Sequence, residues 1–290
     1  MLTIWAPAKL NLSLDVLGKR QDGYHEIRSV VQTVSLCDRV RLTAAPELAV
    51  DSPITPPETD LAWRAATLLQ ARYQVHAGAH IALDKEIPLG AGLGGGSADA
   101  AAVLVGLNQL WELGLGPGEL TAVAAELGSD VPFMIRGGTA LIEGRGEQVT
   151  QLKAPGHPHF VLAMPDMALS TAEVYGRARP GDGRRSERLL AELATGTWQL
   201  AGNDLTEAAI DVLPRLGSLI DDLAARAGVR PQLSGSGSAL FWLAPSQQAG
   251  AELAVRLPSG LTVRVVEAVE ENSLERAKAT ADRGRDRGAD

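Results

Sequence analysis

The feature that most constrains this chain is a glycine-rich stretch, PLGAGLGGGSADAAAVL, which runs from residue 88 to residue 104. Five of the seven residues from Gly90 to Gly96 are glycine, so the backbone can adopt positive φ and approach a ligand closely. A run of strong helix formers follows, from Ala98 to about Leu113. A glycine-rich loop that leads into a helix presents free N–H groups and the positive end of the helix dipole, which bind anions. We therefore expect a phosphate-binding loop.

Three other interpretations of this stretch do not fit its context. A flexible linker would be polar throughout, whereas apolar periodic segments bound this loop. A Walker loop is excluded because no Gly-Lys-Ser or Gly-Lys-Thr closes the turn. The spacing of Gly90, Gly92 and Gly95 matches the dinucleotide fingerprint, but that fold needs a second strand after the helix, ending in an acidic residue about 20 residues on. Here Glu112 lies at the end of the helix, and the sequence GLGP leads into another helix.

The composition is that of an ordinary globular chain. Its 290 residues allow one large or two medium domains, and 45% of them are hydrophobic. A net charge of −8 without a block of Lys and Arg argues against nucleic acid or an anionic membrane as the main partner. Cys37 is the single cysteine, which excludes an internal disulfide and favours a reducing, cytoplasmic location. We find no signal-peptide pattern and no apolar stretch long enough to span a membrane.

An alternating pattern from residue 9 to residue 17 predicts a half-buried strand with one apolar and one polar face. From the residues alone, the ordinary interpretation of the polar face is an outer face in contact with solvent. On the same grounds, Tyr24 is a packing aromatic, His25 a surface residue and Asp130 a helix cap. The apolar face consists of Leu10, Leu12, Leu14 and Val16, and the polar face of Lys9, Asn11, Ser13 and Asp15.

The sequence PGHP at residues 155–158 is the best domain boundary. It divides the chain into an N-terminal domain, residues 1–156, and a C-terminal domain, residues 157–278. The charged residues 279–290 are expected to form a disordered tail. Within the second domain, the segment from Gly181 to Arg185 is expected to be a polar, mobile loop.

Five motifs, taken together and in order, resemble those of a known enzyme family. PAKLNL at 7–12, GLGGGS at 92–97 and LSGSG at 233–237 resemble the three signature regions of the GHMP kinase superfamily of small-molecule kinases. DGYHE at 22–26 and GSDVP at 128–132 narrow the resemblance to the branch that phosphorylates a diphosphocytidyl derivative of methylerythritol. The resemblance extends from Ile4 to about Val266.

The resemblance implies an α+β fold with two domains and the active site between them. The first would be a βαβ ATP-binding domain and the second a ferredoxin-like domain. ATP would lie along the glycine loop, with its triphosphate facing the N-terminus of the following helix. Mg²⁺ is expected to accompany ATP near the Ser97 hydroxyl, and no carboxylate of the motifs is dedicated to it. The residues implied to bind ATP are Pro88, Leu89, Gly90, Ala91, Gly92, Leu93, Gly94, Gly95, Gly96, Ser97 and Ala98.

The resemblance also implies roles for residues outside the loop. Lys9 and Asp130 would be the catalytic pair: Asp130 would deprotonate the acceptor hydroxyl, and Lys9 would offset charge on the moving phosphoryl group. The cytosine would stack between Tyr24 and Tyr175, with His25 hydrogen-bonding its edge. The residues implied to bind this substrate are Asn11, Tyr24, His25, Thr171 and Tyr175.

The implied function is ATP-dependent phosphorylation of a hydroxyl of diphosphocytidyl methylerythritol in the non-mevalonate route to isoprenoid precursors. A mevalonate-type or homoserine-type kinase is the nearest alternative, and the motif DGYHE close after the first strand speaks against it. A non-catalytic nucleotide-binding protein is a second alternative. It would need neither Lys9 nor Asp130, and this chain has both. No coiled-coil repeat indicates an oligomeric state.

Overall fold

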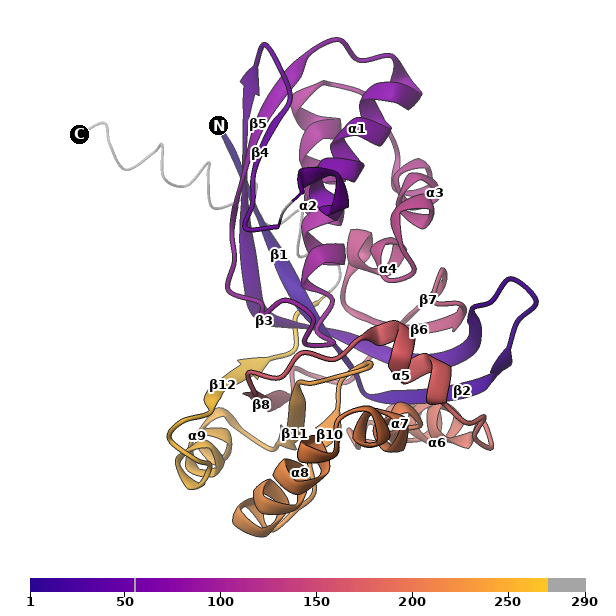
Figure 1. Cartoon of the computed structure of the whole chain (residues 1–290), viewed down its shortest axis with the longest axis vertical. Coiled ribbons are helices and arrows are strands. Elements are labelled where there is room, and N and C mark those ends of the chain that lie inside the picture. The colour runs from indigo at the N-terminus through magenta and orange to yellow at the C-terminus, as the bar shows by residue number, and fades with distance from the viewer. Residues whose placement is uncertain (55, 271–290) are drawn as a thin grey trace.

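The computed structural model describes residues 1–54 and 56–270, in which two halves are joined by long strands (Figure 1). The predicted tail, 279–290, and residues 271–278 of the predicted C-terminal domain lie outside the described residues. No helix in the described ranges is long and apolar enough to cross a membrane.

The first sheet is organised around β3 (His25–Ala45), a strand of 21 residues. It pairs antiparallel with β1 (Leu2–Asn11), β2 (Ser13–Lys19), β5 (Gly78–Asp84) and β6 (Thr139–Gly144). The remaining members of the eight-stranded sheet are β4 (Ala49–Asp51), β7 (Gln148–Leu152) and β9 (Gly202–Asn203).

Helices pack against the first sheet on the side seen at the right of Figure 1. The central one, α2, is almost wholly apolar and is therefore buried along most of its length. Gly106 lets α2 approach the sheet, because a Cβ there would lie 2.7 Å from a methyl group of Leu42. The elements of this layer are η1 (Pro57–Thr59), α1 (Leu61–Tyr73), α2 (Gly95–Leu110), α3 (Pro117–Leu127) and α4 (Val131–Arg136).

The second sheet has the antiparallel order β10–β11–β8–β12, which is the strand order of a ferredoxin-like fold. Trp242 on its central strand packs with Leu216, Ile220 and Leu223 of α8. The strands are β8 (His159–Met164), β10 (Gln232–Leu233), β11 (Leu240–Ala244) and β12 (Thr262–Glu267). The helices are α5 (Thr171–Arg177), α6 (Arg184–Ala194), α7 (Leu205–Val212), α8 (Pro214–Ala227) and α9 (Gln247–Arg256).

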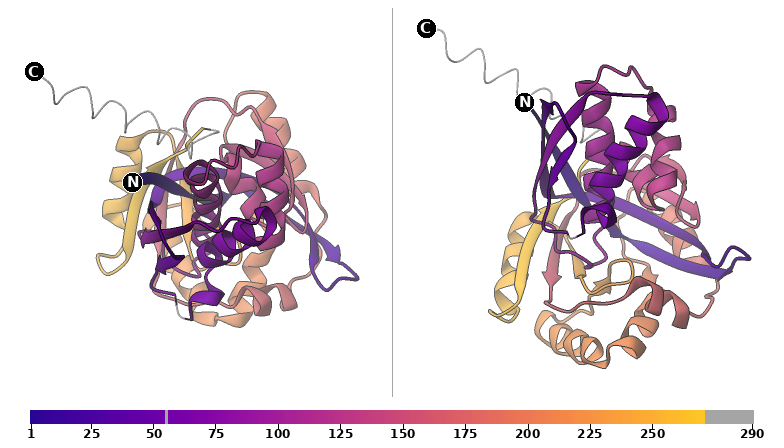
Figure 2. Two further views of the ribbon diagram at one scale, coloured as in Figure 1. Left: turned by 90° about the horizontal axis from the view of Figure 1, so that it is seen from above. Right: turned by 45° about the horizontal axis from the view of Figure 1, so that its top comes forward.

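The two halves lie against each other, as the two further views show (Figure 2), and they share a core. Leu10 and Leu12 of the first half pack in one cluster with Phe160 and Phe241 of the second sheet. Strand β9, from the C-terminal half of the chain, also joins the first sheet, because it pairs in parallel with β2. The connection between β7 and β8 contains the predicted boundary at residue 156, which stays a prediction.

The polar face of the first strand is not in contact with solvent, so the ordinary interpretation of its pattern was wrong. Lys9 is 4% exposed, and Asp15 is fully buried. The glycine loop covers Lys9, while α6 covers Asp15. The pattern also spans two strands, since β1 ends at Asn11 and β2 begins at Ser13.

The segment from Gly181 to Arg185 was expected to be a loop, but helix α6 begins within it, at Arg184. Its cap comes from β2, because the Asp15 carboxylate accepts hydrogen bonds from the N–H groups of Arg185, at 3.0 Å, and Ser186, at 2.8 Å. Because the capping residue lies 170 residues away in the sequence, no local pattern indicates where this helix begins.

Candidate active site

The glycine loop folds into a cradle that only glycine can form at several positions. Gly90, Gly92 and Gly94 have φ of 66°, 75° and 72°, which is the left-handed region. A Cβ on Gly92 would also collide with the carbonyl oxygen of Ser234. Helix α2 begins at Gly95, earlier than the predicted Ala98, and no side chain of the described residues caps it. The N–H groups of its first turn are therefore free to bind a ligand anion.

The loop lines a cavity of about 330 Å³, here called the glycine-loop cavity. Every residue from Pro88 to Ser97 lines it, together with Lys9, Asn11 and Asp130. Ala98, the last predicted member, is instead buried within α2. The structure thus brings the implied catalytic pair to the wall of the implied phosphate site.

Lys9 is held from several sides. Its Nζ atom donates a hydrogen bond of 2.6 Å to Oδ1 of Asn11, whose own amide donates to the hydroxyl of Ser29 at 2.9 Å. Gly94 lies over the aliphatic part of Lys9, since a Cβ there would stand 3.0 Å from Cγ of the lysine. Asn11, predicted to bind substrate, therefore orients Lys9 as well as lining the cavity.

Asp130 stands at the start of α4 but makes no capping hydrogen bond within the described part of the chain. The helix-cap interpretation of this residue was therefore wrong. Its Oδ2 atom lies 3.5 Å from Nζ of Lys9, and its side chain is 31% exposed. The carboxylate is thus paired on one side and open to a ligand on the other.

A second cavity, of about 620 Å³, adjoins the first and is here called the aromatic cavity. Tyr24, His25, Thr171 and Tyr175 all line it, as the sequence implies for the substrate site. The rings of His25 and Tyr175 lie 5.3 Å apart at an angle of 37°. Burial and the nearby Lys19 lower the pKa of His25, which favours the neutral imidazole. Burial and the Asp130 carboxylate raise the pKa of Tyr175, which keeps its phenol protonated.

Arg145 of this cavity was missed by the sequence interpretation. Its guanidinium lies 5.1 Å from the centre of the Tyr24 ring, and it also donates to the carbonyl of Ala125 at 3.2 Å. Lys19 lines the same cavity. The sequence signal for Arg145 is its place between two glycines in the hairpin of β6 and β7, which by itself indicates only a turn.

The loop between β10 and β11, the third motif, closes the site from the C-terminal half. Ser234 donates from its hydroxyl to the carbonyl of Gly92 at 3.0 Å. A Cβ on Gly235 would stand 3.3 Å from Nζ of Lys9, so this glycine allows a close approach. The hydroxyl of Ser236 lies 2.9 Å from that of Thr171. Both halves of the molecule therefore contribute to one site.

A buried ionic network beneath the glycine loop was also missed. The Lys85 ammonium pairs with both Asp38 and Asp99, which are fully buried. Asp38 also accepts from the N–H groups of Glu86, at 2.6 Å, and Ile87, at 2.8 Å. Burial raises the pKa of Asp99 to about 7 against the opposing effect of Lys85. Since Lys85 precedes the loop and Asp99 follows it, the network ties the two ends of the loop together.

The two cavities share five lining residues, Ile27, Ser97, Asp130, Thr171 and Tyr175. A phosphate held by the glycine loop therefore lies beside the carboxylate that opens into the aromatic cavity. Within residues 1–54 and 56–270, no three His, Cys, Asp or Glu side chains gather closely enough to hold a metal ion. The arrangement suits group transfer between two ligands, one in each cavity, with Asp130 and Lys9 at the junction.

The chain is similar to known kinases. The family model described as the GHMP kinases N terminal domain matches residues 60–138. A 4-diphosphocytidyl-2-C-methyl-D-erythritol kinase of Brevibacillus brevis is 43% identical over 254 residues, which cover 83% of this chain and 87% of the relative. The kinase of the same name from Bacillus cytotoxicus is 40% identical over 253 residues, covering 83% and 88%.

Solved structures give the same result. A crystal structure of 4-(cytidine 5'-diphospho)-2C-methyl-D-erythritol kinase has a TM-score of 0.79 at 34% identity, covering 92% of this chain and 99% of that one. A homoserine kinase from Cytophaga hutchinsonii has a TM-score of 0.72 at 19% identity, covering 93% and 95%. The second similarity shows the fold alone. The expected α+β fold with a GHMP kinase architecture is thereby confirmed.

Proposed function

Because the chain belongs to the 4-diphosphocytidyl-2-C-methyl-D-erythritol kinase family of GHMP kinases, we propose that it phosphorylates that diphosphocytidyl alcohol with ATP. The γ-phosphoryl group passes to a hydroxyl of the methylerythritol, which gives the 2-phosphate and ADP. This is the step that the family resemblance implies in the non-mevalonate route to isoprenoid precursors. As a GHMP kinase the chain is an ATP-dependent phosphotransferase.

The observation that carries the proposal is the meeting of the two cavities at Asp130 and Lys9. Phosphoryl transfer needs the donor phosphate, the acceptor hydroxyl and a proton acceptor in line. A triphosphate in the glycine-loop cavity and an alcohol in the aromatic cavity would meet at this junction.

Asp130 acts as the proton acceptor in this mechanism. The bond between the γ-phosphorus and the bridging oxygen of ADP breaks as the substrate oxygen bonds to the phosphorus. The hydroxyl proton passes to the Asp130 carboxylate and from there to solvent. Lys9 lies 3.5 Å from that carboxylate and offsets negative charge on the moving phosphoryl group. The N–H groups at the start of α2 bind the phosphate oxygens.

Mg²⁺ fits this site as a companion of ATP. It usually keeps several waters and binds through substrate phosphates with one or two protein oxygens, so it needs no cage of carboxylates. Ser97, in the first turn of α2 and on the wall of both cavities, is the hydroxyl that we assign to it. Bound there, the ion would neutralise phosphate charge.

The aromatic cavity selects the substrate. Tyr24 and Tyr175 offer ring faces for the cytosine, and the neutral imidazole of His25 can hydrogen-bond its edge. Arg145 and Lys19 bring positive charge to the same cavity, where a diphosphate would lie. Thr171 supplies a hydroxyl at the boundary with the glycine-loop cavity.

A panel assay tests the proposal. ADP formation would be followed with ATP, Mg²⁺ and one alcohol at a time: the diphosphocytidyl alcohol, mevalonate, homoserine, and methylerythritol phosphate without cytidine. We expect turnover with the first alone. Turnover with mevalonate or homoserine would support the alternative kinases. An absence of turnover with every alcohol, despite binding of ATP, would support the non-catalytic alternative.

A further inference from the structure

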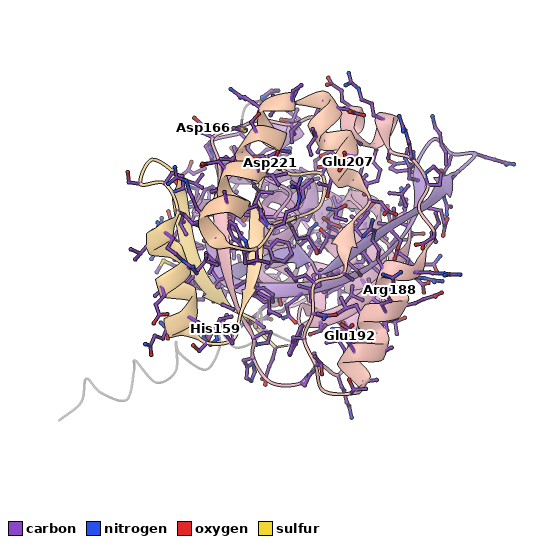
Figure 3. All side chains as sticks on the ribbon, turned by 90° about the horizontal axis from the view of Figure 1, so that it is seen from below. His159, Asp166, Arg188, Glu192, Glu207 and Asp221 are labelled. Carbon is purple, nitrogen blue, oxygen red and sulfur yellow. The ribbon has the colours of Figure 1, made fainter. Side chains whose placement is uncertain are left out.

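A third cavity, of about 790 Å³, lies in the C-terminal half of the molecule. None of its described lining residues lines the glycine-loop cavity or the aromatic cavity. It is formed by the end of α5, the start of α6, α7 and the segments around β9 and β10. Figure 3 views this half from below, with Glu207 of α7, one of the lining residues, labelled. Its volume is in the range of small-molecule sites.

Four arginines from separate segments line this cavity. Arg177 ends α5, Arg179 lies between α5 and α6, Arg185 is in the first turn of α6, and Arg230 precedes β10. They face three acidic residues, so the lining carries a net positive charge in a chain whose net charge is −8. Guanidinium groups present planar, paired donors that match the oxygens of phosphate groups. The acidic residues are Asp204, Glu207 and Asp211.

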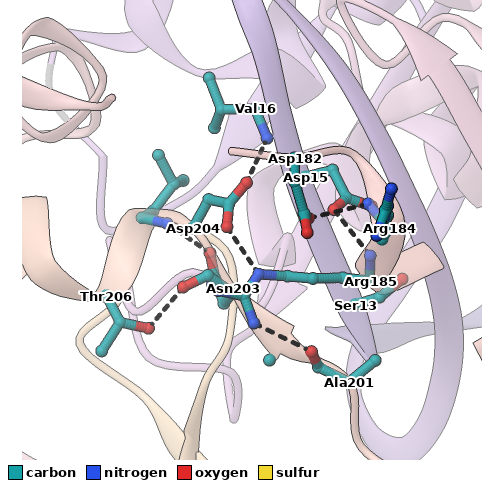
Figure 4. Close-up of polar contacts among 12 residues, drawn as sticks. Ser13, Asp15, Val16, Asp182, Arg184, Arg185, Ala201, Asn203, Asp204 and Thr206 are labelled. Carbon is teal, nitrogen blue, oxygen red and sulfur yellow. Dashed lines mark hydrogen bonds and ion pairs between the residues drawn. The ribbon is translucent and has the colours of Figure 1, made fainter. Parts of the chain in front are cut away.

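Two of the four arginines are held by hydrogen bonds within the protein, and the other two are available to bind a ligand. Arg185 pairs with Asp204 at 2.6 Å and donates to the carbonyl of Ala201 at 3.1 Å (Figure 4). Arg177 donates to a backbone carbonyl of α7 at 2.5 Å. Arg179 makes no hydrogen bond or ion pair with any residue that the structure describes. Among the described residues, Arg230 makes only an exposed ion pair with Asp221, which costs little to exchange for a ligand.

The inner wall of the cavity is rigidly held. The Asp204 carboxylate accepts a hydrogen bond from the N–H of Val16 at 2.9 Å (Figure 4). The side-chain amide of Asn203 donates to the carbonyls of Leu233, at 2.9 Å, and Gly235, at 2.7 Å. Gln232 accepts from the N–H of Gly202 at 2.7 Å and donates to the carbonyls of Asn11 and Leu12, where β1 gives way to β2. A wall that is ordered before binding lowers the entropic cost of binding.

We propose that this cavity is a second ligand site, which binds a small molecule with a diphosphate group through Arg179 and Arg230. The diphosphate lies between these two guanidinium groups at the rim, and the rest of the molecule occupies the cavity over the wall formed by β9 and Gln232. Two guanidinium groups from separate segments can each hold one phosphate of a diphosphate. The site is separate from the kinase reaction and does not depend on its substrate.

Titration of inorganic pyrophosphate by calorimetry tests this site. The full chain would be titrated without nucleotides, because an ATP analogue or cytidine diphosphate carries the same diphosphate group and would fill the proposed site. We expect one pyrophosphate site that is weakened by about tenfold or more in Arg179→Glu and in Arg230→Glu, because each loses a charged hydrogen-bond donor. Pyrophosphate bound in the glycine-loop cavity would keep its affinity in both variants. Thermal melting would confirm that each variant is folded.

Arg256→Glu is the matched control, because it makes the same charge change at an exposed position of α9. We expect its pyrophosphate affinity to equal that of the wild type. The proposal is overturned if the wild type binds no pyrophosphate, if Arg179→Glu and Arg230→Glu bind it as tightly as the wild type at every site, or if the control loses as much affinity as they do.

Discussion

The Nζ atom of Lys9 lies 3.5 Å from Oδ2 of Asp130, where the glycine-loop cavity and the aromatic cavity meet. The pair is asymmetric, because the lysine is buried and anchored by Asn11 while the carboxylate is partly open. An anchored cation beside an accessible carboxylate is what a transfer to a neutral hydroxyl requires, since one group offsets charge and the other takes the proton.

Replacing Tyr24 by alanine should weaken binding of the diphosphocytidyl substrate and leave ATP binding unchanged. Tyr24 is 51% exposed and lines the aromatic cavity but not the glycine-loop cavity, so its loss removes a stacking face without disturbing the core. Stacking of a base on an aromatic ring is worth about 1–3 kcal/mol, so the substrate KM should rise between about fivefold and a hundredfold. Steady-state kinetics with each substrate varied would measure this.

Tyr24→Phe is the matched control, because it keeps the ring and removes only the hydroxyl. Its substrate KM should stay close to that of the wild type. Equal losses of affinity for ATP and for the diphosphocytidyl alcohol in Tyr24→Ala would rule out the stacking role.

The pH dependence of substrate binding should follow His25. Its pKa is lowered from 6.5 by burial and by Lys19, so the neutral imidazole persists to more acidic pH than in a free histidine. The substrate KM should therefore be flat from about pH 8 down to about pH 6.5 and should rise only below that, when the imidazole gains a proton. In His25→Gln, which cannot titrate, the rise should be absent. A rise in the wild type that begins above pH 7 would contradict this.

The glycine loop could be predicted from the residues themselves, because its motif is local, whereas the residues that gather around it were expected there only from the resemblance to a family. The sequence could not show that the polar face of the first strand is buried. An alternating pattern shows that a strand has two faces, but it does not show what packs on each face. The glycine loop that covers Lys9 and the helix that covers Asp15 come from distant parts of the chain. For the same reason, the start of α6 could not be predicted from the sequence, because its capping residue, Asp15, is distant in the chain.

Lys85 was missed for a related reason. A lysine before a glycine loop has the sequence pattern of a surface residue, and only the fold places it between Asp38 and Asp99. Asp130 shows the reverse error: a helix cap was the ordinary interpretation, yet its carboxylate makes no capping bond in the described chain. Its role was predicted only by resemblance to a family.

Lys85→Met should destabilise the fold strongly. It removes the cation that compensates two fully buried carboxylates, and breaking a buried ion pair in this way costs about 3–5 kcal/mol of unfolding free energy. Urea denaturation at neutral pH would measure the change. The control is Arg72→Met, which breaks the exposed pair with Glu126 and should cost less than about 1 kcal/mol. Equal costs for the two variants would contradict a compensating role for Lys85.

The most direct test of the account is the turnover of Asp130→Asn with ATP and the diphosphocytidyl alcohol, measured as ADP formation beside the affinity for ATP. Asparagine keeps the size of the side chain but cannot accept the proton. We predict that kcat falls by about 10²–10⁴ while ATP binding and the melting temperature are unchanged. Turnover at the wild-type rate would show that Asp130 is not the proton acceptor and that the junction of the two cavities is not where the phosphoryl group is transferred.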